Sequence, residues 1–272
     1  MTTAGEQQQK DLIRDRFTRT AEAFGAFSVT YRAQFADRLS EMMNARPDER
    51  AVDLACGPGT LALQFAKKVR WVYGVDLTPA MLLRARGTAA SEGLANLGFT
   101  LGDALRLPIA DGALDLAVTS YSLHHMPDAA GVIREMARVV RRGGRVGIID
   151  IFVPENPRTA ELNNRIEIVR DPSHTHTLAR SEFEGRVCDA GLRILAAEVH
   201  EIPRSFNHWM SVAGWKPGDA AYEQTRRLME ESMAEDGANF HPGYAEGDTA
   251  MPDGRRDILM VNTALFCAAE KN

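Results

Sequence analysis

The sequence predicts an α/β fold built around a mostly parallel β-sheet. Between residues 51 and 151, short apolar segments alternate with helical ones, and several apolar segments end at an aspartate or a glycine. This alternation is typical of parallel sheets whose two faces are covered by helices. Of the 272 residues, 44% are hydrophobic and 25% charged, as in an ordinary globular protein. We therefore interpret residues 1–272 as one domain.

The N-terminal segment, residues 1–47, has a helical pattern. Residues 1–10 are polar and rich in glutamine, and we expect them to be frayed. Two helices should follow. The second has one apolar face, because four large side chains recur at helical spacing: Tyr31, Phe35, Leu39 and Met42.

Strand and helix signals alternate over residues 48–152, the predicted core of the domain. Five strands are expected, at Ala51–Ala55, Trp71–Val75, Phe99–Leu101, Leu114–Thr119 and Arg145–Ile151. Three helices should lie between them: Thr60–Val69, a helix from Thr78 and Pro79 to Arg86, and one that begins at Asp128 and is stopped by Gly143–Gly144. In the third helix, one apolar stripe is expected from Ile133, Met136, Ala137 and Val140.

The second half, residues 153–272, has a less regular pattern. Residues 154–182 resemble an irregular or helical insertion, and Phe183–Ala190 a helix. Leu192–Ile202 and Asp257–Ala268 are strand candidates, separated by an insertion at residues 203–256. We expect the aromatic and methionine side chains of that insertion to be core residues in the main: Trp209, Met210, Trp215, Tyr222, Met229 and Met233. If some of them line a cavity, its ligand should be apolar or aromatic.

Charge and composition exclude several classes of function. The net charge of −5 and the lack of a large Lys/Arg cluster argue against nucleic acid as a partner. No apolar stretch has the length of a membrane helix, and the polar N-terminus resembles no secretion signal. The three cysteines are far apart, so we expect no metal site from them and a reducing, cytoplasmic setting. The sequence gives no indication of oligomeric state.

A glycine loop follows the first predicted strand, at Val52–Thr60. Gly57 and Gly59 have no side chains, so the backbone there can turn tightly and lie against a ligand. The helix that follows offers unpaired N–H groups at its N-terminus. Taken alone, this pattern fits either an ordinary strand-to-helix turn or a nucleotide-cofactor loop.

Two aspartates at later strand ends favour the cofactor loop. Asp76 ends the second predicted strand, about 20 residues after the loop, where a carboxylate can accept hydrogen bonds from two ribose hydroxyls. Asp103 ends the third, where it can accept from an adenine amine. Asp76 could instead be a charge at a helix N-terminus beside Thr78, and Asp103 could be an ordinary turn residue.

The acidic residue before the glycines separates two cofactor classes. The spacing of Gly57, Gly59 and Ala62 permits a dinucleotide loop, which places a pyrophosphate on the helix N-terminus. Asp53 would lie unfavourably near such a phosphate pair. A cationic amino group suits that position better.

These motifs together resemble class I S-adenosylmethionine-dependent methyltransferases, in particular the ubiquinone/menaquinone-biosynthesis group and its small-molecule relatives. Five segments match in order: Asp53-Leu-Ala-Cys-Gly57-Pro-Gly59-Thr, Gly74-Val-Asp76-Leu-Thr-Pro-Ala-Met81-Leu, Gly102-Asp103-Ala-Leu-Arg-Leu-Pro108, Asp115 to Asp128, and Arg138 to Gly144 before a strand. The resemblance spans residues 50–152. Ala55 departs from it, since the family usually has glycine there.

The resemblance implies a Rossmann-like fold with a seven-stranded, mostly parallel sheet, in which Asp257–Ala268 is a late antiparallel strand. It implies S-adenosylmethionine as the cofactor, S-adenosylhomocysteine as its product, and methyl transfer to a small organic acceptor by in-line displacement. The N-terminal helices and the 203–256 insertion should form a lid over the strand ends.

The resemblance also implies roles for individual residues. Asp53 (through water) and the loop backbone would hold the methionine part of the cofactor, Asp76 would bind the ribose, and Asp103 would contact the adenine edge. The remaining cofactor-binding residues implied are Ala55, Gly57, Gly59, Thr60, Leu77, Ala104, Ser120, Tyr121 and, from the lid together with Phe27, Tyr31.

Histidines are the candidates for a catalytic base, which is needed if the acceptor loses a proton as it attacks. His124 and His125 follow the fourth strand and are the nearest candidates for this base. The alternative is that they only fix the loop at that strand end. His174 and His176 lie two residues apart, on one face if the chain is extended. Arg170 to His174 resembles a segment of relatives that lies above the active site there. The two histidines are candidates for acid–base work or acceptor contact, with a surface loop as the alternative. A metal site would need a third ligand, so we predict none.

Three other functions fit some of these observations. The same cofactor pocket could serve a non-methylating reaction such as a cyclisation, or a non-catalytic protein that binds the cofactor for regulation. A nicotinamide dehydrogenase is disfavoured by Asp53. The sequence identifies neither the acceptor nor the atom methylated.

Overall fold

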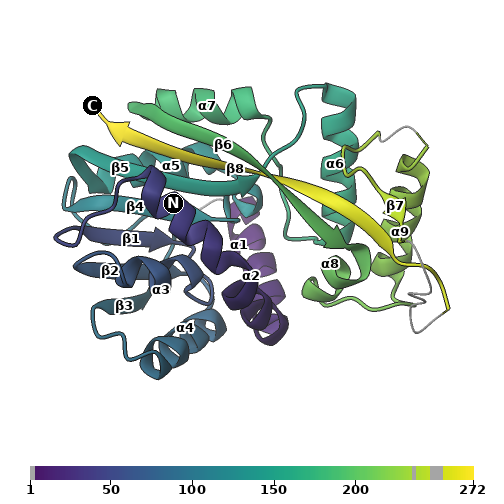
Figure 1. Ribbon diagram of the computed structural model, residues 1–272, viewed down its shortest axis with the longest axis horizontal. Helices are drawn as coiled ribbons and strands as arrows, with labels where there is room; N and C mark the ends of the chain where they lie inside the picture. The colour runs from purple at the N-terminus through teal and green to yellow at the C-terminus, as the bar shows by residue number, and fades with distance from the viewer. Residues whose placement is uncertain (1–3, 235–236, 246–253) are drawn as a thin grey trace.

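The computed structural model describes residues 4–234, 237–245 and 254–272, and over residues 23–33 of one helix it describes the backbone alone. Its centre is a sheet with the strand order β3-β2-β1-β4-β5-β8-β6 (Figure 1). These strands are β1 (Arg50–Leu54), β2 (Trp71–Asp76), β3 (Leu97–Leu101), β4 (Leu114–Ser120), β5 (Val140–Ile151), β6 (Leu192–Ser205) and β8 (Ile258–Lys271).

One strand of this sheet runs against the others. β8 pairs antiparallel with β5 on one side and β6 on the other, while β1 to β5 pair in parallel. A two-residue strand, β7 (Gly243–Tyr244), pairs antiparallel with the start of β8. The predicted mostly parallel, seven-stranded sheet with a late antiparallel strand is therefore confirmed, with β7 as a short addition.

Helices cover both faces of the sheet. On one face lie α2 (Ala21–Met42) and α3 (Thr60–Ala66), with α4 (Pro79–Ser91) beside them; Leu39, Met43 and Phe65 are buried there against Leu116 and Val118. The other face holds α5 (Ala129–Val139) and α7 (Arg180–Asp189). Burying one such leucine or phenylalanine stabilises the fold by about 1.5–3 kcal/mol.

A helical cap extends the molecule beyond the sheet. β6 and β8 are each 14 residues long and project past β5, and α6 (Pro157–Arg170), α8 (Phe206–Val212) and α9 (Ala220–Ser232) gather at their far end (Figure 1). The cap has its own apolar cluster. As predicted, the aromatic and methionine residues of the 203–256 insertion belong to this core: Trp209, Met210, Tyr222 and Met229 are buried, and Trp215 and Met233 pack against them.

Two expectations about element boundaries were wrong. Residues 1–10 are not frayed over their described part, because helix α1 (Ala4–Arg19) begins at Ala4; its polar side chains pair with distant residues, which local sequence does not reveal. The strand expected at Arg145 begins at Val140, after α5 ends at Val139. The Gly143–Gly144 pair lies inside that strand, near a register shift in β4, rather than stopping a helix.

No helix in the described part of the chain is long and apolar enough to cross a membrane.

Candidate active site

A cavity of about 1030 Å³, including its open mouth, lies where β1, β2, β3 and β4 end, with α1 as its outer wall. Open α/β sheets bind ligands at this edge. The strand ends and the loops after them contribute residues predicted to bind the cofactor: Ala55, Gly57, Thr60, Asp76, Leu77, Asp103, Ala104, Ser120 and Tyr121. Helix α1 contributes Glu6, Gln9, Lys10, Ile13 and Phe17.

The loop after β1 owes its shape to left-handed backbone conformations. Ala55, Gly57 and Gly59 have φ values of 51°, 53° and 87°. Glycine adopts these angles without strain, whereas alanine at Ala55 is strained by about 1–2 kcal/mol. Gly59 also lies close to α4, since a Cβ atom there would be 3.1 Å from Ala85 Cβ. The family's preference for glycine at position 55 therefore has a conformational cause.

Asp76 joins this loop to the end of β2. Its Oδ2 accepts a hydrogen bond from the Gly57 N–H at 2.8 Å, and its Oδ1 accepts from the Thr78 N–H at 2.7 Å. Burial raises the pKa of the Asp76 carboxyl, although these two N–H donors oppose the shift. The carboxylate lines the cavity and keeps lone pairs free to accept further hydrogen bonds.

Asp53 and Gly59 are not among the cavity's lining residues. The Asp53 side chain is only 1% exposed, and its Oδ2 accepts from the Ala62 N–H at 3.0 Å, in the first turn of α3. Burial raises the pKa of Asp53 well above its ordinary value. Asp53 thus holds the start of α3 behind the loop.

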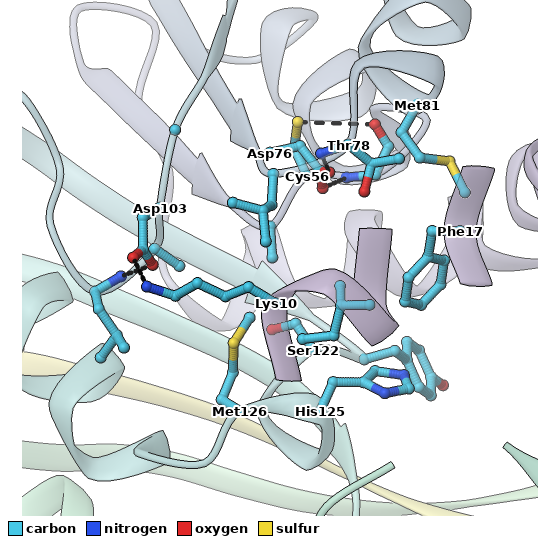
Figure 2. A pocket seen from close by; sticks show the side chains of 18 of the residues that line it. Lys10, Phe17, Cys56, Asp76, Thr78, Met81, Asp103, Ser122, His125 and Met126 are labelled. Carbon is cyan, nitrogen blue, oxygen red and sulfur yellow. Dashed lines mark hydrogen bonds and ion pairs between the residues drawn. The ribbon is translucent and has the colours of Figure 1, made fainter. Parts of the chain in front are cut away.

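Asp103, at the end of β3, is paired with the N-terminal helix. Lys10 Nζ reaches across the cavity to Asp103 Oδ2 at 2.6 Å, as Figure 2 shows, and Asp103 Oδ1 accepts from the Leu105 N–H at 3.0 Å. A cation from α1 therefore lies where the resemblance places the adenine amine.

At the end of β4 the chain turns sharply into the cavity wall. Tyr121 has a φ of 51°, a strained conformation for a bulky residue, and its N–H donates to the Ile149 carbonyl oxygen at 2.7 Å. Ser120 and Ser122 flank it in the cavity lining. Strained backbone of this kind is concentrated at functional sites.

His124 forms a dyad with Asp150, the last residue but one of β5. His124 Nδ1 and Asp150 Oδ1 are 2.5 Å apart, and the same carboxylate accepts from the Leu123 and Ile151 N–H groups. Burial alone would raise the pKa of Asp150, but the His124 ring and these donors outweigh it and hold the pKa below its ordinary value. An ionised carboxylate only accepts, so Nδ1 carries the proton and Nε2 is left as a base.

The His125 side chain is buried and is held by a hydrogen bond and by ring packing. Its Nδ1 lies 3.0 Å from the Ser173 carbonyl oxygen, its ring packs edge-on against Phe17, and burial, with His124 nearby, lowers its pKa to about 3. The segment Arg170 to His174 is held to α1 by a buried ion pair at 2.8 Å between Arg16 and Asp171. The segment predicted to lie above the active site thus connects α1 to the end of β4.

His174 and His176, which would share a face if the chain were extended, lie in different environments. His174 is buried, with Nε2 at 3.1 Å from Asn164 Oδ1, and burial lowers its pKa to about 2. Its ring stacks on His124, with the centroids 5.3 Å apart. The His176 side chain is 57% exposed, near Glu182, and Thr175 between the two histidines hydrogen-bonds to the His124 carbonyl oxygen.

A second cavity, of about 530 Å³, adjoins the first, and Phe17, Tyr121 and His125 line both. It lies between the sheet and the cap. Its other lining residues come from α1, the end of β4, β5, α6, β6, α8 and β8: Arg16, His124, Ile151, Glu167, Arg170, Asp171, Arg204, Trp209, Val212 and Asn262.

Several of these residues escaped prediction from the sequence. Lys10, Arg16 and Phe17 lie on a helix whose first part was expected to be frayed, while Arg204 and Asn262 are isolated positions on strands. Asp150 alone had a usable signal, as an acid that ends an apolar strand like Asp76 and Asp103. Tyr31, predicted to cover the cofactor, and Phe27 have side chains outside the described residues.

Comparisons with known proteins agree with this geometry. Residues 51–144 match the family model described as a methyltransferase domain. The uncharacterized methyltransferase YcgJ of Bacillus subtilis (strain 168) is 29% identical over 198 residues, 73% of this chain and 78% of that protein. A crystal structure of YcgJ covers 88% of this chain and 99% of its own, at 26% identity and a TM-score of 0.77. Residues 51–144 are thus a methyltransferase domain, and the comparisons support a class I S-adenosylmethionine-dependent methyltransferase.

Other relatives of this methyltransferase bear the names of small-molecule enzymes. The 27-O-demethylrifamycin SV methyltransferase of Amycolatopsis mediterranei (strain S699) is 32% identical over 169 residues, 61% of each chain. The demethylmenaquinone methyltransferase of Corynebacterium efficiens is 30% identical over 149 residues, 54% of this chain and 60% of that protein. The predicted resemblance to the menaquinone group is therefore confirmed.

The first cavity fits the cofactor of this methyltransferase family. Asp76 offers a buried carboxylate with unused lone pairs, and the left-handed loop at Gly57 leaves backbone without side chains at the wall. Met81, Leu105 and Met126 add an apolar surface suited to an adenine ring.

Proposed function

We propose that this methyltransferase acts on a small organic acceptor and that His124 removes the proton the acceptor loses. The observation that carries the proposal is the His124–Asp150 dyad beside the cofactor cavity. When bound, the cofactor supplies a methyl group on a positively charged sulfur, which is already electrophilic. The protein's task is then to orient the acceptor and to accept its proton.

Roles for the cofactor-binding residues follow from their positions. We assign the ribose hydroxyls to Asp76, the adenine edge to Asp103 and Ala104 with Leu77 against the ring, and the methionine part to the loop around Ala55, Gly57 and Thr60, with Ser120 and Tyr121 opposite. Asp53 and Gly59 act behind the wall by shaping the loop.

The acceptor's proton is assigned to His124 Nε2. This atom forms no hydrogen bond to any residue that the structure describes, whereas Nδ1 is held by Asp150. Asp150 fixes the ring and stabilises it once it is protonated. His174, stacked on the same ring, is proposed to hold His124 in place rather than to transfer protons itself.

We propose that α1, rather than the second N-terminal helix, forms most of the N-terminal lid. Its Lys10 and Phe17 line the cofactor cavity, whereas Leu39 and Met43 of the second helical segment pack in the sheet core. A reducing cytoplasmic setting is supported by the three unpaired cysteines, Cys56, Cys188 and Cys267.

Calorimetry with S-adenosylhomocysteine, followed by mass spectrometry of a metabolite extract incubated with protein and S-adenosylmethionine, tests this function. We expect the product to bind and one or more metabolites to gain the mass of a CH₂ group only when the cofactor is present. Absence of cofactor binding would contradict the whole assignment. Cofactor binding without any methylated product would favour a non-methylating reaction or a regulatory protein.

A further inference from the structure

The second cavity contains a buried hydrogen-bond acceptor without a partner. Asn262 is 5% exposed, and its Oδ1 is buried and accepts no hydrogen bond from the described part of the chain. Nearly all buried polar side chains in proteins are paired, so an exception needs an explanation. An amide oxygen can only accept, so the missing partner is an O–H or N–H group. Since Asn262 lies in the cavity wall, a bound molecule can supply that donor.

The strand register places Asn262 near the proposed base. In the β5–β8 pairing, Ala264 is opposite Ile151, the residue that follows Asp150 of the dyad. Asn262 lies two residues from Ala264 on the same face of β8, about 7 Å along the strand. Asn262, Ile151 and His124 all line the cavity. The wall therefore carries two acceptor atoms at separate points, the Nε2 of the base and the amide oxygen.

The charged side chains of the lining are engaged by the protein itself. Arg16 Nε is 2.8 Å from Asp171 Oδ2, and Arg170 Nη1 is 3.1 Å from Glu167 Oε2. Arg204 also interacts with other residues of the chain. Polar recognition of a ligand is therefore assigned to the two acceptor atoms, and a ligand that satisfies both must carry two donors.

Aromatic side chains line the rest of this cavity on two sides. Phe17 and Tyr121 lie at the junction with the cofactor cavity, and Trp209 forms part of the cap side. The Arg170 guanidinium stacks on Trp209, 4.3 Å from the ring centroid, and fixes its orientation. Flat apolar walls of this kind suit an aromatic ring.

Resting on the proposed function, we infer that the second cavity is the acceptor site and that the acceptor is an aromatic molecule with two hydrogen-bond donors. One donor is the group that faces His124. The other donates to Asn262 Oδ1, which thereby sets how the ring lies in the cavity and makes Asn262 a specificity-determining residue. A hydroxyl and an amine share this donor chemistry, so the test includes both.

Calorimetry on the full chain saturated with S-adenosylhomocysteine tests this inference with substituted phenols. The probes with a second donor are resorcinol, hydroquinone, 3-aminophenol and 4-aminophenol, and their analogues without one are 3-fluorophenol and 4-fluorophenol. We expect at least one donor probe to bind about tenfold more tightly than the fluorophenol substituted at the same ring position, because the fluorophenol leaves a buried acceptor unpaired. The strongest probe identifies the second donor and its place on the ring.

Variants assign the donor preference to one atom. Asn262→Leu should weaken binding of the best donor probe about tenfold and leave the fluorophenols unchanged. Asn262→Asp should keep the preference, because a carboxyl group retains an acceptor oxygen in either protonation state. Thr263→Val, at the next position of β8 on the other face of the sheet, is the control and should change nothing. Each variant must bind S-adenosylhomocysteine like the wild type, which shows that it is folded.

The outcomes separate the two proposals. Equal affinity for donor probes and fluorophenols, or no binding of any probe, would overturn the inference on the wild-type chain alone, whether or not the variants fold. A donor preference that survives Asn262→Leu, or is lost in Asn262→Asp, would overturn it too. All of these results leave the cofactor assignment intact. Failure of the wild-type chain to bind S-adenosylhomocysteine would contradict the proposed function itself.

Discussion

The two adjoining cavities are built from very different parts of the chain. Apart from α1, the cofactor cavity takes its walls from one stretch between Ala55 and Asp128, where each strand end contributes a residue. The second cavity combines residues from seven elements, from Arg16 in α1 to Asn262 in β8. A site built from consecutive strand ends leaves an ordered series of motifs in the sequence. A site built from distant segments leaves isolated residues whose meaning appears only in three dimensions.

Removing the proposed base should affect the chemistry and spare the cofactor cavity. For His124→Gln and for Asp150→Asn, we expect kcat to fall by about 10²- to 10⁴-fold, the usual contribution of a general base, with unchanged affinity for S-adenosylhomocysteine. The measurement is the initial rate of methyl transfer in the extract assay, alongside calorimetry. His208→Gln, at an exposed histidine of the cap, is the matched control. Full activity of both dyad variants would remove His124 from the mechanism.

A substitution in the cofactor cavity should weaken cofactor binding. Asp76→Asn removes the charge proposed to bind the ribose and leaves one strong acceptor for the Gly57 and Thr78 N–H groups. We expect affinity for S-adenosylhomocysteine to fall about 10- to 100-fold, as for the loss of a charged hydrogen bond. Calorimetry measures it, with Asp111→Asn at an exposed aspartate as the control. An unchanged dissociation constant would show that Asp76 only shapes the loop.

The buried histidines near the second cavity should make the fold sensitive to acid. The folded-state pKa of His174 lies near 2, below the ordinary value of 6.5, so below pH 6.5 the unfolded chain takes up a proton that the folded chain does not. Stability is therefore complete above pH 6.5 and falls by about 1.4 kcal/mol per pH unit below it for this one group. His125 acts in the same direction, while Asp53 and Asp76, with raised pKa values, oppose it.

Comparison of variants isolates the His174 contribution. Denaturant unfolding of the wild type and of His174→Asn at pH 6.5, 5.5 and 4.5 should show a shallower pH dependence for the variant, by about 1.4 kcal/mol per pH unit. Parallel curves for the two proteins would mean that His174 is protonated in the folded state. His176→Asn, at the exposed histidine, should leave the slope unchanged.

The smallest effect concerns the strained residue of the cofactor loop. Ala55→Gly relieves a left-handed conformation but increases the freedom of the unfolded chain, so we expect a net gain in the free energy of unfolding of at most about 1 kcal/mol. Urea denaturation measures it. A clear destabilisation would mean that the Ala55 methyl group packs usefully in the loop. Gly57→Ala, at a similar φ, is the informative reverse change and should destabilise by about 1 kcal/mol.

The sequence was sufficient for the sheet and most of the cofactor cavity, for a physical reason. Residues such as Asp76 and Asp103 follow directly from strands whose order is readable, because parallel strands bring their carboxyl ends to one edge. The pairing of Lys10 with Asp103 joins residues 93 positions apart and has no local signature. His174 and His176 illustrate the same limit, since the first is buried and the second is exposed although only Thr175 separates them in the sequence.

Helix α1 contributes to both cavities, and this has a consequence for how the two sites bind their ligands. Lys10 lies at the cofactor end, where it occupies Asp103, while Arg16 and Phe17, less than two turns further along, belong to the second cavity. A cofactor that displaces Lys10 therefore acts on the same rigid element that shapes the acceptor's surroundings. Thermodynamic reciprocity requires the acceptor to change cofactor affinity by the same factor. We therefore expect the acceptor to change the dissociation constant of the cofactor by the same factor by which the cofactor changes that of the acceptor.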